Sequence, residues 1–597
     1  MKKRWEIEEK DTWKLEDIIP GDQAWEALYE EASREVKEYG QFQGKLGESA
    51  DTLLRALEFE DRISLKIEKL YVYGRMKSDE DTGNQENQER FGRAQALYFE
   101  AAGLSSFMVP EILSLEPSVL QAFLEENEGL QVYRRLFQML EKRRAHTLPA
   151  QMEALLAQSY DATQGASQIF NMFNNADVRF PAITGENGQE LSVTHGTYIS
   201  LLENKDRRIR RDAFQALYSV YAQYKNTICA TFSANVKQAL FYAKARGYAS
   251  SRQHSLAENE VPEAVYDNLV TAVRKGLPLL HRYVGIRKKA LGLEDLHMYD
   301  LYVSMAADVE RRYTIEEAKN LVLEGLKPLG EEYGKLLRQG FEDRWIDVYE
   351  NEGKRSGAYS WGVYGTHPYV LMNFNGTLND VFTLAHEMGH SIHTYYSNQA
   401  QPYVYAGYKI FVAEVASTCN EALLIRYLMG RTKDRKELLH LINHFLESFR
   451  GTLFRQTMFA EFEQQAHQMA GEGKPLTAQN LCRMYHQLNV DYFGPELTVD
   501  EEIDYEWERI PHFYTPFYVY QYATGFSAAV AISSGILKGD GQVLRGYRKF
   551  LEGGCSQTPV DLLKLCGVDL STPEPIEKAL DVFRELLDQF EKEGGLS

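Results

Sequence analysis

The sequence predicts a mainly α-helical protein with a small amount of β structure. Apolar residues recur at three-to-four spacing over most of the chain, which is the period of a helix with one buried face. Only 17 prolines occur in 597 residues, so long stretches are free to stay helical. A hydrophobic content of 44% is ample for more than one buried core.

The helical pattern is clearest in the first third of the chain, where it follows residues 22–44, 48–80, 84–108, 116–143 and 147–162. A β-hairpin is predicted next. Val178–Ile183 and Glu190–Thr194 are short apolar runs on either side of the turn Gly185–Gly188. Helical patterning resumes near residue 196 and continues to about residue 340.

Residues 341–376 differ from their surroundings, because three short strand-like runs lie there among glycines. These runs are Asp347–Tyr349, Tyr359–Trp361 and Tyr369–Phe374. From residue 379 to the end the pattern is helical again, except for an aromatic stretch around residues 512–525. The fold predicted from these patterns is helical with one small sheet just before residue 379.

The H-E-M-G-H motif at residues 386–390 carries the strongest chemical signal in the chain. Residues i and i+4 of a helix share a face, so the imidazoles of His386 and His390 converge on one point. Glu387 lies between them and projects beside that point, within reach of a metal-bound water. The motif therefore predicts a zinc site with a general base next to it.

The helix that carries this motif is predicted to begin at Asn379 and Asp380, which offer a cap and a negative N-terminus. His393 competes as a third zinc ligand, because it falls on the same helical face. Along the axis, however, His386 and His393 are about 10 Å apart, too far for both to bind one ion. We therefore expect His393 to have a packing role.

A second apolar helical run follows, and it carries two carboxylates, Glu414 and Glu421. A buried carboxylate is costly unless a cation or strong donors accompany it. Catalytic zinc sites commonly use three protein ligands, and two histidines with one glutamate is a well-known set. We predict Glu414 as the third ligand of one zinc ion per chain. Glu421 lies two turns further along the same face, where it would accept the N–H of a ligand imidazole.

These residues resemble a known family. The runs His386–His393 and Phe411–Glu421 resemble those of the thimet-oligopeptidase family of zinc metallopeptidases. The likeness is narrower to its oligoendopeptidase F branch, which includes the bacterial Pz-peptidases, and the runs Tyr369–Gly376 and Arg509–Gly525 are similar to that branch as well. The resemblance covers about residues 200–590. It implies that His386, His390 and Glu414 bind zinc and that Glu387 is the general base.

The resemblance also implies an architecture and an activity. The fold would be a two-lobed helical metallopeptidase with a small β-sheet beside the zinc helix and a deep substrate channel. We accordingly divide the chain into an N-terminal helical region (1–110), a helical region with a β-hairpin (111–200) and a zinc metallopeptidase catalytic domain (201–597). The implied reaction is hydrolysis of internal bonds in short unstructured oligopeptides.

The strand predicted at Tyr369–Phe374 has a chemical use in such an enzyme. An exposed strand edge can hold an extended peptide through main-chain hydrogen bonds. This run ends shortly before the zinc helix, so it can lie over the active site. We predict Tyr369, Leu371 and Asn373 as substrate-binding residues.

The aromatic stretch contains candidates for a further catalytic role. Amide hydrolysis builds negative charge on the former carbonyl oxygen, and imidazole N–H and tyrosine O–H groups are suitable donors to it. The family uses a histidine and tyrosines from this region, and His512 matches directly. Tyr518 and Tyr522, one helical turn apart, are the predicted tyrosine donors. Tyr514 and Tyr520 stay as alternatives, because the spacing here departs from the thimet-oligopeptidase branch.

Composition indicates which binding partners and which cellular compartment to expect. A net charge of −20 and a pI near 5.3 argue against nucleic acid and anionic membranes as partners. The N-terminus has no apolar signal segment, and no apolar run is long enough to span a membrane. The odd number of scattered cysteines is typical of reduced cytoplasmic thiols. They are Cys229, Cys419, Cys482, Cys555 and Cys566. The sequence predicts a cytoplasmic protein and leaves its oligomeric state open.

Two other function classes fit part of the pattern. Another zincin, such as an aminopeptidase, would share the zinc chemistry, but it should carry an acidic or G-x-M-E-N-like site for the substrate amine, and we find none in the sequence. A non-catalytic peptide-binding protein would keep a cleft and lose the general base, whereas Glu387 is present. The endopeptidase interpretation therefore fits best.

Overall fold

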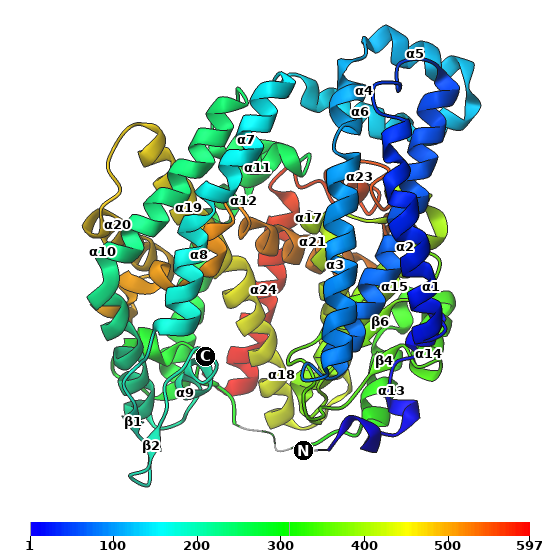
Figure 1. Cartoon of the computed structure of the whole chain (residues 1–597). Helices are drawn as coiled ribbons and strands as arrows, with labels where there is room; N and C mark the ends of the chain where they lie inside the picture. The colour runs from blue at the N-terminus through cyan, green and yellow to red at the C-terminus, as the bar shows by residue number, and fades with distance from the viewer. Residues whose placement is uncertain (1, 308, 310, 597) are drawn as a thin grey trace. The chain divides into compact units, whose positions relative to one another are not determined.

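The computed structural model describes residues 2–307, 309 and 311–596, and 71% of it is helical (Figure 1). All of its sheets have two or three strands. The predicted mainly α fold is therefore confirmed. Among the described residues no single helix is long and apolar enough to cross a membrane, although one helix pair bent by 102°, Gln85–Ser114 with Pro117–Glu126, meets the same criteria of length and composition.

The chain forms two compact units, each assembled from three separated segments. The first unit comprises Met1–Thr147, Arg311–Leu424 and Ile532–Gly567. The second comprises Leu148–Glu310, Ile425–Ala531 and Val568–Ser597. The predicted borders near residues 110 and 200 stay predictions.

In the first unit a long helix, α2 (Ala50–Glu80), lies beside α3 (Gln85–Ser105) (Figure 1). Ser49 caps α2 by accepting the backbone N–H of Thr52. The remaining helices of the unit's N-terminal and C-terminal segments are α1 (Asp22–Glu35), α4 (Met108–Ser114), α5 (Pro117–Glu126), α6 (Arg134–Arg144), α22 (Gly541–Leu551) and α23 (Pro559–Lys564). The continuous helix expected over residues 116–143 is broken after Glu126, because the Asn127 side chain accepts the N–H of Gly129 and turns the chain.

The central segment of the first unit carries the small predicted sheet. Its strands are β4 (Ile346–Asp347), β5 (Tyr359–Trp361) and β6 (Tyr369–Leu371), in the order β4-β6-β5. β6 pairs in parallel with β4 and antiparallel with β5. The helices of this segment are α13 (Ile315–Gly325), α14 (Glu331–Glu342), α15 (Leu378–Ala400), α16 (Tyr403–Ala406) and the first part of α17 (Ile410–Arg431).

The N-terminal residues cover the β4 side of this sheet. Arg4 pairs with the fully buried carboxylate of Asp347 at 2.5 Å, and the Nζ of Lys354 reaches the same group at 2.7 Å. Burial alone would raise the pKa of Asp347, but the hydrogen bond to Arg4 and the charge of Lys354 lower it below its usual value. The N–H of Val348 also donates to the carbonyl of Asp11. The sheet is thus closed by the N-terminal chain on one side.

The second unit is almost wholly helical. Its longest helix, α10 (Arg207–Ala245), is capped by the Asp206 side chain. The other helices are α7 (Ala150–Thr163), α8 (Gly165–Met172), α9 (Tyr198–Leu202), α11 (Ser251–Glu258), α12 (Glu263–Leu291), α18 (Arg435–Ser448), α19 (Arg455–Gly471), α20 (Ala478–Phe493) and α24 (Glu574–Gly594). α21 (Tyr520–Leu537) begins in this unit, and a π-helical turn at Phe449–Phe454 joins α18 to α19.

The predicted hairpin lies in the second unit and is confirmed. β1 (Ile183–Thr184) pairs antiparallel with β2 (Glu190–Leu191). Both strands are shorter than the apolar runs that predicted them. A parallel pair, β3 (Leu296–His297) with β7 (Leu497–Thr498), was not predicted, because two residues per strand leave no readable alternation.

Candidate metal centre

The H-E-M-G-H motif lies inside α15, as its spacing predicted. The helix begins two residues earlier than expected, because Thr377 and not Asn379 is the cap. The Thr377 hydroxyl accepts the N–H of Asp380, and the Asp380 carboxylate accepts the N–H of Thr377, which forms a capping box. Leu384 and Met388 on this helix are fully buried. A well-anchored helix therefore fixes the positions of both histidines.

The second carboxylate-bearing helix, α17, approaches α15 very closely at Gly389. A Cβ atom added to Gly389 would lie 2.6 Å from the Cα of Ser417 and 2.9 Å from the carbonyl oxygen of Ala416. One helical turn before Gly389 on α15, the carbonyl of Ala385 accepts a hydrogen bond from the side-chain amide of Asn420 on α17, at 3.0 Å. Only glycine permits this separation, and the amide bond fixes the register of one helix on the other.

Three ligand atoms meet where the two helices face each other. The Nε2 atoms of His386 and His390 are 3.2 Å apart, and an Oε2 atom of Glu414 lies 3.4 Å from the first and 3.6 Å from the second. Ligands at about 2.0–2.1 Å from a tetrahedral ion lie about 3.3–3.4 Å from one another. The triangle therefore has the dimensions of three corners of a tetrahedral site. Among the described residues this is the one group of histidine, cysteine and acidic side chains with the spacing of a metal site.

Glu421 lies on the far side of the His386 ring, where its Oε1 atom is hydrogen-bonded to Nδ1. An imidazole that donates from Nδ1 keeps the lone pair of Nε2 free, and in His386 that Nε2 atom points into the triangle. Ser417 holds the third ligand in a similar way, since its hydroxyl donates to Glu414 Oε2 at 3.1 Å. Two of the three ligands are thus oriented by neighbours on α17.

The charges in this group are strongly coupled. Burial alone would raise the pKa of Glu414, but hydrogen bonds from His386 and His390 outweigh it and lower the pKa below its usual range. Burial would lower the pKa of His386, and its bonds to Glu414 and Glu421 raise it instead. For Glu387, burial raises the pKa against the opposing charges of the two histidines. Glu414 is therefore held as an anion, while Glu387 has an increased affinity for a proton.

His393, the competing ligand, lies elsewhere. Its ring is 1% exposed and stacks on Tyr408 with 3.8 Å between the ring centres. Burial lowers its pKa to about 3, so it is a neutral packing residue. It does not belong to the metal-binding group.

The expectation that Tyr369–Phe374 presents an open strand edge is wrong. β6 is the central strand of its sheet, so both of its edges are already paired. Tyr369 and Leu371 are fully buried, and the Asn373 amide donates to the carbonyls of Arg355 and Gly357. The sequence showed where the strand would be, but strand order depends on pairing with residues far away in the chain.

The edge strand beside the metal helix is β5. Among the described residues it has a strand neighbour on one side only, β6. The Ser360 hydroxyl of β5 lies 2.8 Å from the Ser391 hydroxyl of α15, one residue beyond His390. The side chains of β5 are half-buried. The sheet edge without a strand partner beside the metal helix is therefore that of β5, and not of β6.

The second unit brings three other predicted residues together. The Tyr522 hydroxyl lies 3.2 Å from Nε2 of His512, and the ring of Tyr518 is stacked parallel to His512 at 5.6 Å. Tyr518 and Tyr522 are also in edge-to-face contact. These residues form an aromatic cluster with polar groups at its surface.

The alternative tyrosines have other contacts. The Tyr514 hydroxyl lies 2.9 Å from that of Thr231, and its ring stacks on Phe170. Tyr520 is 1% exposed and packs against Tyr266. Phe517 adopts a left-handed backbone conformation between these residues, and its N–H donates to the buried carboxyl of Glu463. The turn at Phe517 separates Tyr514 from Tyr518, Tyr520 and Tyr522 along the chain.

Residues 200–582 match the sequence model of peptidase family M3, and residues 111–180 match that of oligopeptidase F. The chain belongs to peptidase family M3. The chain is similar to oligopeptidase PepF of Bacillus subtilis (strain 168), which is 49% identical over 99% of this chain and 88% of that protein. An oligoendopeptidase F homolog of Lactococcus lactis is 42% identical over 99% of this chain and 98% of its own length.

Two solved structures have the same fold. Oligoendopeptidase F from Enterococcus faecium has a TM-score of 0.76 and 40% identity, and the match covers 96% of this chain and 100% of that chain. A structure from Chlamydophila abortus gives a TM-score of 0.92 and 34% identity, over 99% of this chain and 100% of that chain. The family resemblance predicted from the motifs is confirmed.

Sequence analysis did not single out Gly389 or Asn420, although both determine how α17 meets α15. Glycine in a helix interior costs about 0.5–1 kcal/mol relative to alanine, so one next to a metal-binding histidine indicates a close backbone approach. An asparagine within an apolar helix similarly indicates a buried hydrogen bond. Both signals were present in the sequence, but neither indicates which residue the helix contacts at that point.

Replacing Gly389 by alanine should push α17 away from α15. We expect a loss of about 1–3 kcal/mol of stability, as for other overpacked cores, together with weaker metal binding. Thermal unfolding and zinc retained after dialysis against a weak chelator measure the two effects. Gly92 on α3 is a matched control, since nothing lies within 4 Å of its added Cβ. Gly92→Ala should keep full zinc retention and raise stability slightly, by about 0.5–1 kcal/mol. Full zinc retention in Gly389→Ala would contradict the role of this contact.

Proposed function

We propose that this protein is a zinc-dependent endopeptidase that hydrolyses internal bonds of short unstructured oligopeptides. The observation that supports this most directly is the triangle of His386, His390 and Glu414, with Glu387 beside it, in a member of peptidase family M3. Two imidazole nitrogens and one carboxylate oxygen are a donor set that suits zinc. These three residues would hold one zinc ion per chain, with Glu421 orienting His386.

When bound, zinc supplies a Lewis acid that acidifies a water molecule and polarises a carbonyl oxygen. Glu387 is the proposed general base. Its side chain is 6% exposed and accepts no hydrogen bond from the described residues, so its oxygens are available to a water proton. Its raised pKa favours taking that proton and then delivering it to the leaving amine.

We assign the remaining roles as follows. The open edge of β5 would hold the substrate backbone through main-chain hydrogen bonds. His512, Tyr518 and Tyr522 would donate to the negative charge that develops on the scissile carbonyl oxygen. The exposed polar groups of this aromatic cluster support that role, whereas Tyr514 is committed to Thr231.

All five cysteines are free thiols, which supports the predicted cytoplasmic location. The substrates would be oligopeptides, as the names of the relatives suggest. A charge of −20 favours neither nucleic acids nor anionic membranes as partners.

The assigned roles of Glu387 and Glu414 are separable. Glu387→Gln should retain one zinc per chain but lose about 10²–10⁴ in kcat, because an amide cannot accept the water proton. Glu414→Ala should lose the metal, because two histidines on one helix leave the site under-filled. Zinc content by mass spectrometry and cleavage of an internally quenched peptide measure these outcomes.

Glu342→Ala provides the control for this pair, since Glu342 is an exposed residue of α14 in the same unit. It should change neither zinc content nor turnover. One tightly bound zinc in Glu414→Ala, or near-normal turnover in Glu387→Gln, would refute the corresponding role.

The donor role of the aromatic cluster predicts an effect on kcat with little change in KM. Tyr522→Phe removes one hydroxyl, and loss of a donor to an oxyanion typically lowers the rate by about 10²–10³. Tyr514→Phe is the matched control, because its hydroxyl bonds to Thr231 and its loss should affect stability alone. Equal kcat values in the two variants would show that the Tyr522 hydroxyl is not a donor to the oxyanion and that the residue only packs.

Substrate size distinguishes the endopeptidase from the other classes. A quenched peptide with both ends blocked should be cleaved, whereas an aminopeptidase requires a free amino terminus. A stable folded protein should resist, because exposing a scissile segment costs much of its own unfolding free energy, about 5–15 kcal/mol. Rapid cleavage of the folded protein, or dependence on a free amino terminus, would count against the proposal. Binding of the blocked peptide without cleavage by the zinc-loaded enzyme would favour the peptide-binding alternative.

A further inference from the structure

The second unit contains a set of buried and half-buried ion pairs in which each carboxylate serves two arginines. Asp300 binds Arg207 at 2.9 Å and Arg210 at 2.7 Å. Glu447 binds Arg450 at 2.8 Å and also Arg287, and Glu506 binds Arg455 at 2.6 Å and Arg509 at 3.0 Å. Six guanidinium groups thus share three carboxylates. Positive charge is in excess here, although the whole chain carries −20.

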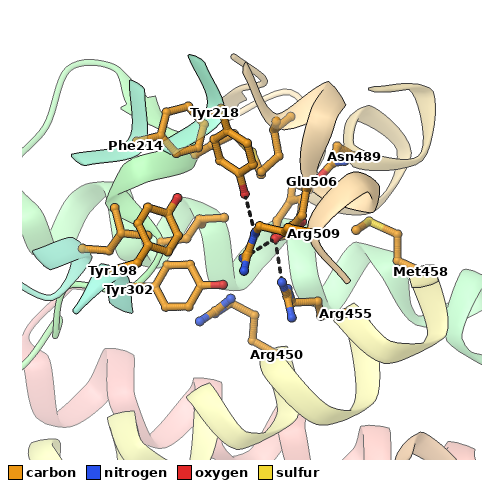
Figure 2. Close-up of a pocket in the computed structure, with 15 residues that line it drawn as sticks. Tyr198, Phe214, Tyr218, Tyr302, Arg450, Arg455, Met458, Asn489, Glu506 and Arg509 are labelled. Carbon is orange, nitrogen blue, oxygen red and sulfur yellow. Dashed lines mark hydrogen bonds and ion pairs between the residues drawn. The ribbon is translucent and has the colours of Figure 1, made fainter. Parts of the chain in front are cut away.

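Part of this excess faces a cavity, shown in Figure 2. The cavity has an empty volume of about 380 Å³, which includes space open to solvent, and its enclosed part has room for one small, water-sized group. Its polar lining includes Arg450, Arg455, Arg509, Tyr198, Tyr302 and Asn489. Glu506 is the one acidic residue among the lining side chains. The lining therefore holds three positive charges against one negative charge.

The arginine N–H groups are not all used by protein acceptors. Arg450 bonds to Glu447 through Nε and Nη2, which leaves its Nη1 without a partner among the described residues, and its side chain is 5% exposed. Arg455 uses only Nη2, on Glu506. Arg509 uses Nε on the Tyr218 hydroxyl and Nη2 on Glu506, so its Nη1 is likewise unused within the described chain.

Tyr302 completes the polar surface of the cavity. Its ring lies under the guanidinium of Arg450, 4.6 Å from the ring centre. Its hydroxyl has no hydrogen-bond partner among the described residues, and Figure 2 shows it pointing toward the guanidinium groups of Arg450 and Arg509. A tyrosine O–H and several guanidinium N–H groups thus converge without a protein acceptor.

Buried guanidinium groups are costly unless charge and hydrogen bonds compensate them. Glu447 is already shared between Arg287 and Arg450, and Glu506 between Arg455 and Arg509. Glu203, the other acidic group near Glu447, is exposed and does not line the cavity. Water can accept some of the N–H groups, but it cannot neutralise the charge. A bound anion does both.

We propose that this cavity is a binding site for a small inorganic anion of about the size of chloride. The N–H groups of Arg450, Arg455 and Arg509 and the O–H group of Tyr302 would hold it. The small enclosed space favours a halide over a phosphate. None of the residues that line the cavity is a proposed metal ligand, so the anion site does not rest on the proposed zinc chemistry.

Thermal unfolding of the full-length protein tests this proposal. Chloride is titrated against methanesulfonate at constant ionic strength, so that only the identity of the anion changes. An anion that binds the folded state raises the unfolding temperature with saturation as chloride increases. Crystals soaked in bromide should show an anomalous peak between Arg450 and Arg509. Identical unfolding temperatures in both salts, together with no bromide peak, would overturn the proposal.

Substitutions test whether the effect of chloride on the unfolding temperature arises at this cavity. Tyr302→Phe keeps the ring under Arg450 and removes only the hydroxyl, so the protein should fold and the chloride midpoint should rise about tenfold. Arg450→Met should abolish the response. Arg274→Met is the control, because Arg274 also bridges two carboxylates, Glu461 and Asp491, but does not line the cavity. Its response to chloride should match that of the unmodified protein.

Two further outcomes would count against the site. If Arg274→Met loses the chloride response as fully as Arg450→Met, the effect is a general salt effect. If phosphate stabilises the protein and chloride does not, the cavity takes a larger oxyanion and the halide assignment is wrong.

Discussion

The candidate metal centre depends on one steric constraint, the contact of α17 with α15 at Gly389. His386 and His390 belong to one helix and Glu414 to the other, so the distance between the helices determines whether a triangle with edges of 3.2–3.6 Å can exist. With no Cβ at position 389, the backbone at Ser417 comes within contact distance. The bond from Asn420 to Ala385 then sets the register. The same packing brings Glu421 to the outer face of the His386 ring.

Buried charge is handled differently in the two units. At the metal centre the histidines and carboxylates of α15 and α17 are matched, and the lowered pKa of Glu414 follows from the two imidazoles that face it. In strand β4, Asp347 is fully buried but has both Arg4 and Lys354 as partners. In the arginine cavity the balance is reversed, since cations outnumber carboxylates. Such an imbalance is tolerable only if something other than the protein supplies negative charge.

In the small sheet, the place of a strand in the sequence does not determine whether it is a central or an edge strand. Three short runs were recognisable as strands from their composition, and all three form one sheet. Which of them is central depends on parallel pairing of Ile346 with Val370 and antiparallel pairing of Tyr359 with Leu371. The N-terminal chain then covers the β4 side through Arg4 and Asp11. As a result, the open edge falls on β5, beside the helix that carries His390.

The sequence by itself determined the helical class, the position of the helix that carries the H-E-M-G-H motif and the family, because each depends on local periodicity or on a motif within a few residues. The i, i+4 spacing of His386 and His390 has one geometric meaning on a helix. Only the tertiary structure decided that Thr377 is the cap, that β5 is the edge strand and that Tyr514 is bound to Thr231. It also brought together the arginines of the cavity. Arg450 lies in the turn before α19, Arg455 is the first residue of α19, and Arg509 follows more than fifty residues later in the chain. No local pattern contains such contacts, because they arise from packing between distant segments.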